Sequence, residues 1–301
     1  MRSAGAALLL LGFGIAGCER KIESAGPRYG STPSAAVEAG YSFAIHPLYN
    51  PEKLMRAYQP LVDFLNSVIE GPRLRLEASR DYASYEGKYR ERKPELLLPN
   101  PWETLQALKS GYRVIAMAGD PGDFRGLIIV RKDGGVEDPQ DLKGKAVSYP
   151  SRTALAACVM PQYFLHVRGI DILGDIENRY VGSQESSIMN VFLKLTAAGA
   201  TWPPPWRAFV KDHPGEAEQM RIAWETESLV NNSVMIRADL PFETGERLRA
   251  ALIGLHETER GRSILAGMET SRFLAASDDD YDAVRAYIEC FERDVRKVES
   301  E

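Results

Sequence analysis

The sequence predicts an α/β protein built from two lobes with a cleft between them. Short apolar segments typical of strands alternate with longer segments of helical periodicity, and this alternation restarts near residue 141. Such an alternation indicates a mainly parallel sheet with helices on both faces. A late strand at residues 233–237, after which the chain is helical, indicates a return to the first lobe.

The first α/β unit starts at residue 41. Its clearest helix covers residues 52–69, where apolar side chains recur at helical spacing, namely Leu54, Met55, Tyr58, Leu61, Val62, Leu65 and Val68. Further helices are predicted at residues 81–92 and 102–110. Apolar runs bounded by turn residues predict strands at residues 41–45, 74–78, 95–98, 114–118 and 126–130.

The second unit begins with a strand at residues 146–149, which turns at Pro150 into a helix. This helix starts at Thr153 and must kink near Pro161, because proline has no N–H to donate within a helix. A helix at residues 186–198 and a proline-rich turn at 202–206 follow. The remaining predicted strands are 178–181, 220–226 and 233–237, and the remaining helices are 242–257, 261–266 and 279–298.

The first forty residues indicate an export signal and a tether. Arg2 precedes an apolar run at residues 6–15 that is too short to span a bilayer, and Cys18 directly follows Ala16 and Gly17. This resembles a bacterial lipoprotein signal, so we expect a lipid anchor on Cys18 and a periplasmic or extracellular location; a plain secretory peptide is the alternative. The predicted organisation is a signal peptide at 1–17, a flexible tether at 18–40, lobe 1 at 41–130 plus 232–301, and lobe 2 at 131–231.

Composition and motif content argue against several functions. The net charge of −5 provides no basic surface for nucleic acid. The sequence has no P-loop, serine-hydrolase elbow, metalloprotease motif or dinucleotide fingerprint, so we expect neither an enzyme nor a cofactor. The four histidines are scattered and zinc-type spacing is absent, which predicts no metal site. Cys158 and Cys290 form either a disulfide or two free thiols.

Two loops of the second unit join a strand to a helix through small polar residues. Ser151, Arg152 and Thr153 stand at one helix start, where unpaired N–H groups and the helix dipole favour an anion. Gln184 and Glu185 stand at the next helix start. The alternative for each loop is an ordinary N-cap or capping box. Two such loops in one half of the chain nevertheless indicate that both face one ligand.

Residues at other loops complete the predicted site. Three prolines between Trp202 and Trp206 predict a polyproline II segment, which presents its indoles either as an aromatic wall or as a packed turn between the lobes. Arg125 either supplies charge to a ligand or pairs with Asp123. The further candidates, in the first half and at the return between lobes, are Tyr82, Trp102, Phe124, Arg125 and Asn231.

Taken together, these segments resemble the PhnD-like substrate-binding proteins of phosphate, phosphite and phosphonate ABC transporters. The matching segments, in family order, are residues 43–51, 58–61, 81–82, 127–130, 141–145, 151–153, 182–185 and 261–265. The resemblance implies a type II periplasmic-binding-protein fold, whose two lobes close about a hinge on a small oxyanion. By position it places six residues in the cleft: Tyr82, Phe124, Ser151, Thr153, Gln184 and Glu185.

Three departures from the family pattern bear on the ligand. Phe124 stands where the family tends to have tyrosine, and Gln184 replaces a histidine. Ala198 replaces an acidic residue that can bind the ammonium group of an aminophosphonate. These departures argue against an aminophosphonate and leave a compact oxyanion of phosphate, phosphite or phosphonate type.

The predicted function is capture of this oxyanion by a monomeric, lipid-anchored binding protein that delivers it to the permease subunits of an ABC importer. The alternative is a ligand-sensing module that presents its closed form to a membrane sensor kinase. An enzyme on the same fold is a third possibility, which would require Cys158 or Glu185 for turnover.

Overall fold

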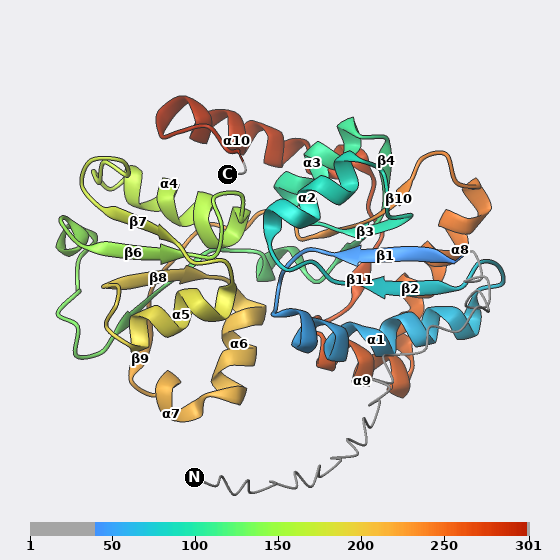
Figure 1. Cartoon of the computed structure of the whole chain (residues 1–301), viewed down its shortest axis with the longest axis horizontal. Coiled ribbons are helices and arrows are strands. Elements are labelled where there is room, and N and C mark those ends of the chain that lie inside the picture. The colour runs from blue at the N-terminus through green and yellow to red at the C-terminus, as the bar shows by residue number, and fades with distance from the viewer. Residues whose placement is uncertain (1–39, 300–301) are drawn as a thin grey trace, which may run out of the picture. The chain divides into compact units, whose positions relative to one another are not determined.

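The structure is a computed structural model that describes residues 40–299. The predicted signal peptide, Cys18 and the tether up to residue 39 lie outside the described residues. Within residues 40–299 the chain forms two separate sheets, and helices lie on either side of each sheet (Figure 1). The predicted α/β class is therefore confirmed.

The first sheet has six strands in the order β11-β4-β10-β3-β1-β2. Their bounds are β1 Tyr41–Ile45, β2 Leu74–Glu77, β3 Leu96–Leu98, β4 Tyr112–Ala118, β10 Ser233–Arg237 and β11 Phe273–Leu274. Strand β1 pairs in parallel with β2 and β3, whereas β10 runs antiparallel to both β3 and β4. Strand β11 pairs antiparallel with β4.

The second sheet has five strands in the order β7-β6-β8-β5-β9. Their bounds are β5 Leu127–Arg131, β6 Ala146–Tyr149, β7 Glu177–Tyr180, β8 Ala198–Thr201 and β9 Met220–Glu225. Strand β6 pairs in parallel with β7 and β8, and β5 runs antiparallel to β8 and β9.

Both sheets are mixed, so the prediction of a mainly parallel sheet was wrong. Strands β5 and β10, which run against their parallel neighbours, are each formed directly after the chain leaves the other sheet, and the short edge strand β11 also runs antiparallel to β4. The two segments that cross between the sheets are residues 119–126 and 226–232. After each crossing, the first strand runs antiparallel to its neighbours in the new sheet. The alternation of strands and helices in the sequence does not reveal this direction.

The strand pairing also corrects one lobe boundary. The first part of lobe 1 was predicted to end at residue 130, but β5 pairs with β8 and β9 of the second sheet along its length. The chain therefore leaves the first sheet after β4. The remaining predicted bounds stay predictions.

The α-helices of the described chain alternate with these strands. They are α1 Pro51–Val68, α2 Tyr82–Arg90, α3 Pro101–Lys109, α4 Met160–His166, α5 Gln184–Phe192, α6 Pro203–Asp212, α7 Pro214–Ala217, α8 Phe242–Ile253, α9 Glu259–Gly267 and α10 Asp282–Asp294. A π-helix, η3 Leu155–Val159, runs directly into α4. Short 3₁₀ turns are η1 Pro121–Asp123, η2 Pro139–Leu142, η4 Gly254–Glu257 and η5 Asp278–Tyr281.

The predicted helix at residues 186–198 extends too far at its C-terminal end, because its last residue, Ala198, is the first residue of β8. Helix α5 ends at Phe192, and Lys194 adopts the left-handed conformation (φ 59°) that commonly terminates helices. The Ala-Gly-Ala-Thr sequence of β8 shows no apolar alternation, so no strand was predicted there. Its small residues allow α5 to pack closely, because a Cβ on Gly199 would lie 2.5 Å from the Ser187 carbonyl oxygen.

The predicted polyproline II turn is a helix. Residues 203–205 form the first turn of α6, with Trp202 immediately before it. Proline fits this position because the N–H that it lacks would have no partner within the first helical turn. The predicted kink near Pro161 takes the form of η3, in which the Val159 N–H donates to the Ala154 carbonyl, five residues earlier, at 3.2 Å.

Two further features bear on function. No helix between residues 40 and 299 is long and apolar enough to cross a membrane. Cys158 and Cys290 are free thiols rather than a disulfide, and Cys158 is buried.

Candidate functional site

The turn between β6 and η3 leaves a helix start without a side-chain cap. Ala154 precedes η3 and no side chain accepts a hydrogen bond from the first N–H groups there. Ser151 and Thr153 instead interact with each other: their hydroxyl oxygens lie 3.2 Å apart, and Ser151 Oγ accepts the Thr153 N–H at 3.3 Å. The alternative of an ordinary N-cap is therefore wrong for this loop. The leading N–H groups of the helix remain available to an external acceptor.

These N–H groups border a small space, which we call the central cavity. Residues 154–157 form one wall, and the other lining residues are His46, Tyr82, Asn100, Phe124, Gln184, Trp202 and Asn232. Its volume is about 10 Å³, enough for about one water molecule. The lining residues come from loops and helices next to both sheets.

The residues contributed by the first sheet stand where strands end and helices begin. His46 directly follows β1. Asp81 caps α2 by accepting the Ser84 N–H, which makes Tyr82 the first residue of that helix. Asn100 follows β3 and forms a capping box with Glu103 at the start of α3. Ligand sites in α/β proteins commonly lie at these carboxyl ends of parallel strands.

Direct hydrogen bonds close the central cavity from both sides. Asn100 Nδ2 donates to the Thr153 carbonyl at 3.3 Å, and Thr153 Oγ1 donates to Glu86 Oε1 at 2.9 Å. Gln184 Nε2 donates to the Tyr82 hydroxyl at 3.3 Å. Each of these bonds joins an element next to the first sheet to one next to the second sheet. The walls of the central cavity are therefore bonded directly to each other, and we call this arrangement the closed form of the site.

Two aromatic rings form the apolar part of the lining. The ring centroids of Phe124 and Trp202 lie 5.4 Å apart, and both side chains are buried. Phe124 lies on the first crossing segment, and Trp202 is the residue between β8 and α6. Trp202 thus reaches the cavity as predicted, although from a helix start rather than from a polyproline segment.

A second space, which we call the outer pocket, adjoins the central cavity. Its volume is about 200 Å³, and its lining residues are Asp81, Tyr82, Ala83, Glu86, Pro150, Ser151, Arg152, Tyr180 and Gly182. Tyr82 borders both spaces. The guanidinium carbon of Arg152 lies 5.1 Å from the centre of the Tyr180 ring. The predicted residues Ser151 and Arg152 therefore line the outer pocket, whereas Thr153 is buried and lines neither space.

Five predicted site residues line neither the central cavity nor the outer pocket: Trp102, Arg125, Thr153, Glu185 and Asn231. Arg125 Nε pairs with Glu225 Oε2 at 2.5 Å, and Glu185 Oε1 lies 3.4 Å from His213 Nε2. Asn231 uses both ends of its amide within the crossing segments, donating to the Asp120 carbonyl at 3.0 Å and accepting the Asn232 N–H at 2.8 Å. Trp102 is buried in the first turn of α3.

Besides residues 154–157, three lining residues are absent from the predicted set: His46, Asn100 and Asn232. The last two are sequence neighbours of predicted residues, Asn100 next to Pro101-Trp102 and Asn232 next to Asn231. His46 carried one usable signal, its position directly after the first strand. A lone histidine there is also compatible with a core position.

Burial favours the neutral forms of three ionisable side chains at or near the central cavity. It lowers the pKa of His46 to about 4, although the hydrogen bond to the Leu98 carbonyl opposes this shift. It raises the pKa of the Tyr82 phenol and, well above its usual range, that of the Glu103 carboxyl, which the Glu86 carboxylate raises further. No cluster of metal-binding side chains occurs in the described part of the chain.

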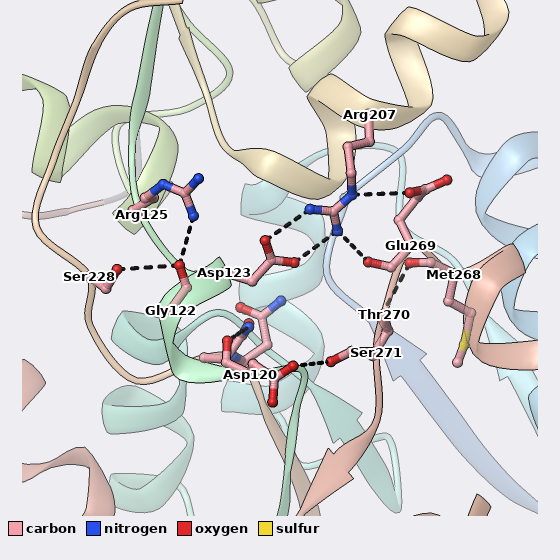
Figure 2. Close-up of polar contacts among 12 residues, drawn as sticks. Asp120, Gly122, Asp123, Arg125, Arg207, Ser228, Met268, Glu269, Thr270 and Ser271 are labelled. Atoms are coloured by element: carbon pink, nitrogen blue, oxygen red, sulfur yellow. Dashed lines mark hydrogen bonds and ion pairs between the residues drawn. The ribbon is translucent and has the colours of Figure 1, made fainter. Parts of the chain in front are cut away.

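A set of ion pairs links α6 to the first crossing segment and to the chain after α9 (Figure 2). The Arg207 guanidinium donates to both carboxylate oxygens of Asp123 at 2.9 and 2.8 Å, and to the Glu269 carboxylate at 3.2 Å and carbonyl at 2.8 Å. Lys211 also pairs with Glu269, and Lys53 of α1 pairs with Asp212 of α6. These pairs hold α6, which follows β8 of the second sheet, against elements next to the first sheet.

Comparison with known proteins gives the family. Residues 43–281 match the family described as the periplasmic substrate-binding protein of phosphonate ABC transporters. The probable ABC transporter phosphite binding protein PhnD1 of Prochlorococcus marinus (strain MIT 9301) is 23% identical over 181 residues. That match covers 56% of this chain and 61% of the relative's own length.

Solved structures show the same fold. The structure of PhnD1 from Prochlorococcus marinus (MIT 9301) in complex with methylphosphonate has a TM-score of 0.76 at 18% identity, covering 84% of this chain and 98% of that chain. A binding protein component of an ABC phosphonate transporter from Pseudomonas aeruginosa has a TM-score of 0.76 at 17% identity, covering 84% and 86%. Because the family match spans most of its 301 residues, the protein belongs to the family of periplasmic substrate-binding proteins of phosphonate ABC transporters.

Proposed function

We infer that this protein is the extracytoplasmic binding component of an ABC importer and captures a small phosphorus oxyanion, of phosphate, phosphite or phosphonate type, in the central cavity. The main observation that supports this ligand site is the helix start without a side-chain cap, whose first residues border the central cavity. Membership of the family supports the transport role.

The lining of the central cavity suits an anion. Backbone N–H groups at a helix start carry partial positive charge and donate to oxyanions. The Tyr82 hydroxyl accepts a hydrogen bond from Gln184, so its own hydrogen can be donated to a ligand. Hydrogen bonds to a charged acceptor are strong where water is excluded.

The same lining offers nothing to an ammonium group. None of the residues that border the central cavity is acidic. Ala198, the position at which the sequence lacks the family's acid, is buried in β8 and does not border the cavity. It is therefore the absence of an acidic lining residue, rather than Ala198, that disfavours an aminophosphonate.

Ligand entry requires the closed site to open. A cavity of about 10 Å³ is too small for a phosphorus oxyanion, so the walls must separate before a ligand is bound. Several hydrogen bonds join the crossing segments, among them those from Asn231 Nδ2 to the Asp120 carbonyl and from the Leu229 N–H to the Phe124 carbonyl, both at 3.0 Å. In this proposal the paired crossing segments act as the hinge.

The remaining parts of the proposal concern location and partners. A lipid on Cys18 anchors the protein to a membrane, and the ligand-bound form docks as a monomer on the permease subunits. The protein binds its ligand without chemical change. The export signal in the sequence and the transport proteins of the family support these assignments.

Isothermal titration calorimetry with phosphate, phosphite and methylphosphonate tests the ligand class. At least one of the three should bind, and Gln184→Ala should weaken that binding at least tenfold. The matched control is Glu185→Gln, one residue along the same helix, because Glu185 contacts His213 and does not border the cavity. The proposal fails if none of the three anions binds, or if both variants bind like the wild-type protein.

A further inference from the structure

His46 gives the central cavity a hydrogen-bond acceptor. Its Nδ1 lies 2.9 Å from the Leu98 carbonyl oxygen, and a carbonyl only accepts, so Nδ1 carries the ring hydrogen. In a neutral imidazole with this tautomer, Nε2 carries no hydrogen, and its lone pair can accept a hydrogen bond. The side chain is 2% exposed, and burial lowers its pKa to about 4, so the ring is neutral near pH 7.

The acceptor on Nε2 is unused within the protein. Among residues 40–299 the imidazole makes one hydrogen bond, the one from Nδ1. With Nδ1 turned toward β3, Nε2 lies on the far side of a ring that lines the central cavity. Its nearest aromatic neighbour is Tyr82, at 6.3 Å between ring centres.

Asn232, which also lines the cavity, has a second buried acceptor without a partner. Its Oδ1 is buried and has no hydrogen-bond partner among the described residues, while its backbone N–H is bound to Asn231. Buried acceptors without a donor are uncommon in folded proteins, because they lose water without compensation. Donors at the helix start and acceptors at His46 and Asn232 therefore meet at one small site.

We propose that the central cavity selects an oxyanion that carries a hydrogen on one of its oxygens, and that Nε2 of His46 accepts this hydrogen. This inference rests on the proposed function and narrows its ligand to the monoprotonated form of a phosphorus oxyanion. A fully ionised phosphonate has only acceptors, so it would place an oxygen lone pair against the lone pair of Nε2. A sulfonate has the same shape and a single negative charge but no hydrogen to donate.

The ionisation of the ligand gives this selection a pH dependence. The second ionisation of phosphate-type groups falls near neutral pH, at about 6 for a phosphoserine, and the monoprotonated fraction then falls tenfold per pH unit. The neighbouring ionisable groups are Tyr82 and Glu86 on α2, Glu103 on α3 and Cys158 on η3. Burial raises the pKa of Tyr82, Glu103 and Cys158, and Glu86 is paired with Arg90.

The test is a calorimetric titration from pH 5.5 to 9 with methylphosphonate and its isostere methanesulfonate. The affinity for methylphosphonate should fall about tenfold per pH unit above the second pKa of the ligand. Methanesulfonate should bind at least 100-fold more weakly than methylphosphonate at pH 5.5. His46→Gln should flatten the pH dependence, because a glutamine amide can rotate to donate to the dianion. The control Glu103→Gln removes a buried carboxyl group near the cavity. This variant should keep the wild-type dependence of methylphosphonate affinity on pH.

Several outcomes would overturn this inference. They are an affinity for methylphosphonate that is constant or rises with pH, methanesulfonate binding as tight as methylphosphonate, or an unchanged slope in His46→Gln. The first two use the wild-type protein and decide the matter even if the variant does not fold. Binding without the pH dependence contradicts only this inference, whereas no binding of any phosphorus oxyanion at any pH contradicts the proposed function as well.

Discussion

The guanidinium of Arg207 and the carboxylate of Asp123 form a two-point hydrogen bond, with N···O distances of 2.9 and 2.8 Å (Figure 2). Arg207 lies on α6, next to the second sheet, and Asp123 lies on the first crossing segment. The same guanidinium reaches Glu269, beyond α9. In the closed form of the site, the Arg207 side chain thus connects α6 to the segment that we propose as a hinge.

Replacing Arg207 with methionine should weaken ligand binding. The pair is partly exposed, so its loss should cost about 1–2 kcal/mol of the stability of the closed form, a five- to thirty-fold increase in Kd. Calorimetry with the bound anion measures this change. The control is Arg285→Gln, because Arg285 forms an exposed pair with Asp282 within α10. Equal affinities for the two variants would show that the ion pairs do not contribute to closure.

Tyr82→Phe should weaken binding by a similar factor. The change removes a hydroxyl that accepts from Gln184 and, in our proposal, donates to the ligand, for a loss of about 1–2 kcal/mol. Tyr85→Phe is the matched control on the same helix. The Tyr85 hydroxyl is buried without a partner in the described chain and does not border the cavity, so its removal should leave affinity unchanged and stability unchanged or higher. Equal effects on affinity would contradict the assigned role of Tyr82.

The buried His46 should contribute to the pH dependence of the free energy of unfolding. The pKa of His46 is lowered from 6.5 to about 4, so the unfolded chain binds more protons between these values. The contribution of His46 is complete above pH 6.5 and is lost as the pH falls toward 4, by at most about 3 kcal/mol. Urea unfolding of His46→Gln should show less acid destabilisation than the wild type. His256→Gln, at a half-buried histidine, should retain the wild-type curve; identical curves for all three proteins would contradict the prediction.

Glu103 should give the free energy of unfolding a pH dependence of opposite sign to that of His46. Burial first, and the Glu86 carboxylate second, raise its pKa well above the usual range, so the folded protein holds a proton that the unfolded chain releases. Its stabilising contribution is complete below the unfolded pKa of about 4.5 and is lost as the pH rises, at about 1.4 kcal/mol per pH unit. Glu103→Gln should therefore gain stability relative to the wild type between pH 5 and 8. Glu289→Gln, at an exposed glutamate, should show no such gain.

The parts of the structure that local sequence determines were predicted well. The apolar spacing of residues 52–69 predicted a helix that spans Pro51–Val68, and its buried residues belong to the predicted apolar stripe. The helix after β6 was predicted to start at Thr153; it starts two residues later, at Leu155, and that start has no side-chain cap. Helical periodicity and turn residues act over a few positions, so they can be read without the rest of the chain.

The misplaced residues depend on partners distant in sequence. Arg125 was proposed as a source of charge, but Glu225, one hundred residues later, pairs with it. Asn231 is occupied by Asp120 across the two crossing segments, which leaves Asn232 at the cavity. The role proposed for His46 depends on the Leu98 carbonyl that fixes its tautomer. No local pattern specifies these contacts, because they form only when the two sheets come together.

The most direct test of the central claim is a crystal structure of the protein grown with methylphosphonate. We predict electron density for the anion in an enlarged central cavity, with its oxygens within hydrogen-bond distance of the N–H groups of residues 155–157 and of the Tyr82 hydroxyl. Anion density confined to the outer pocket beside Arg152, with the N–H groups of the helix start free of ligand, would contradict the account.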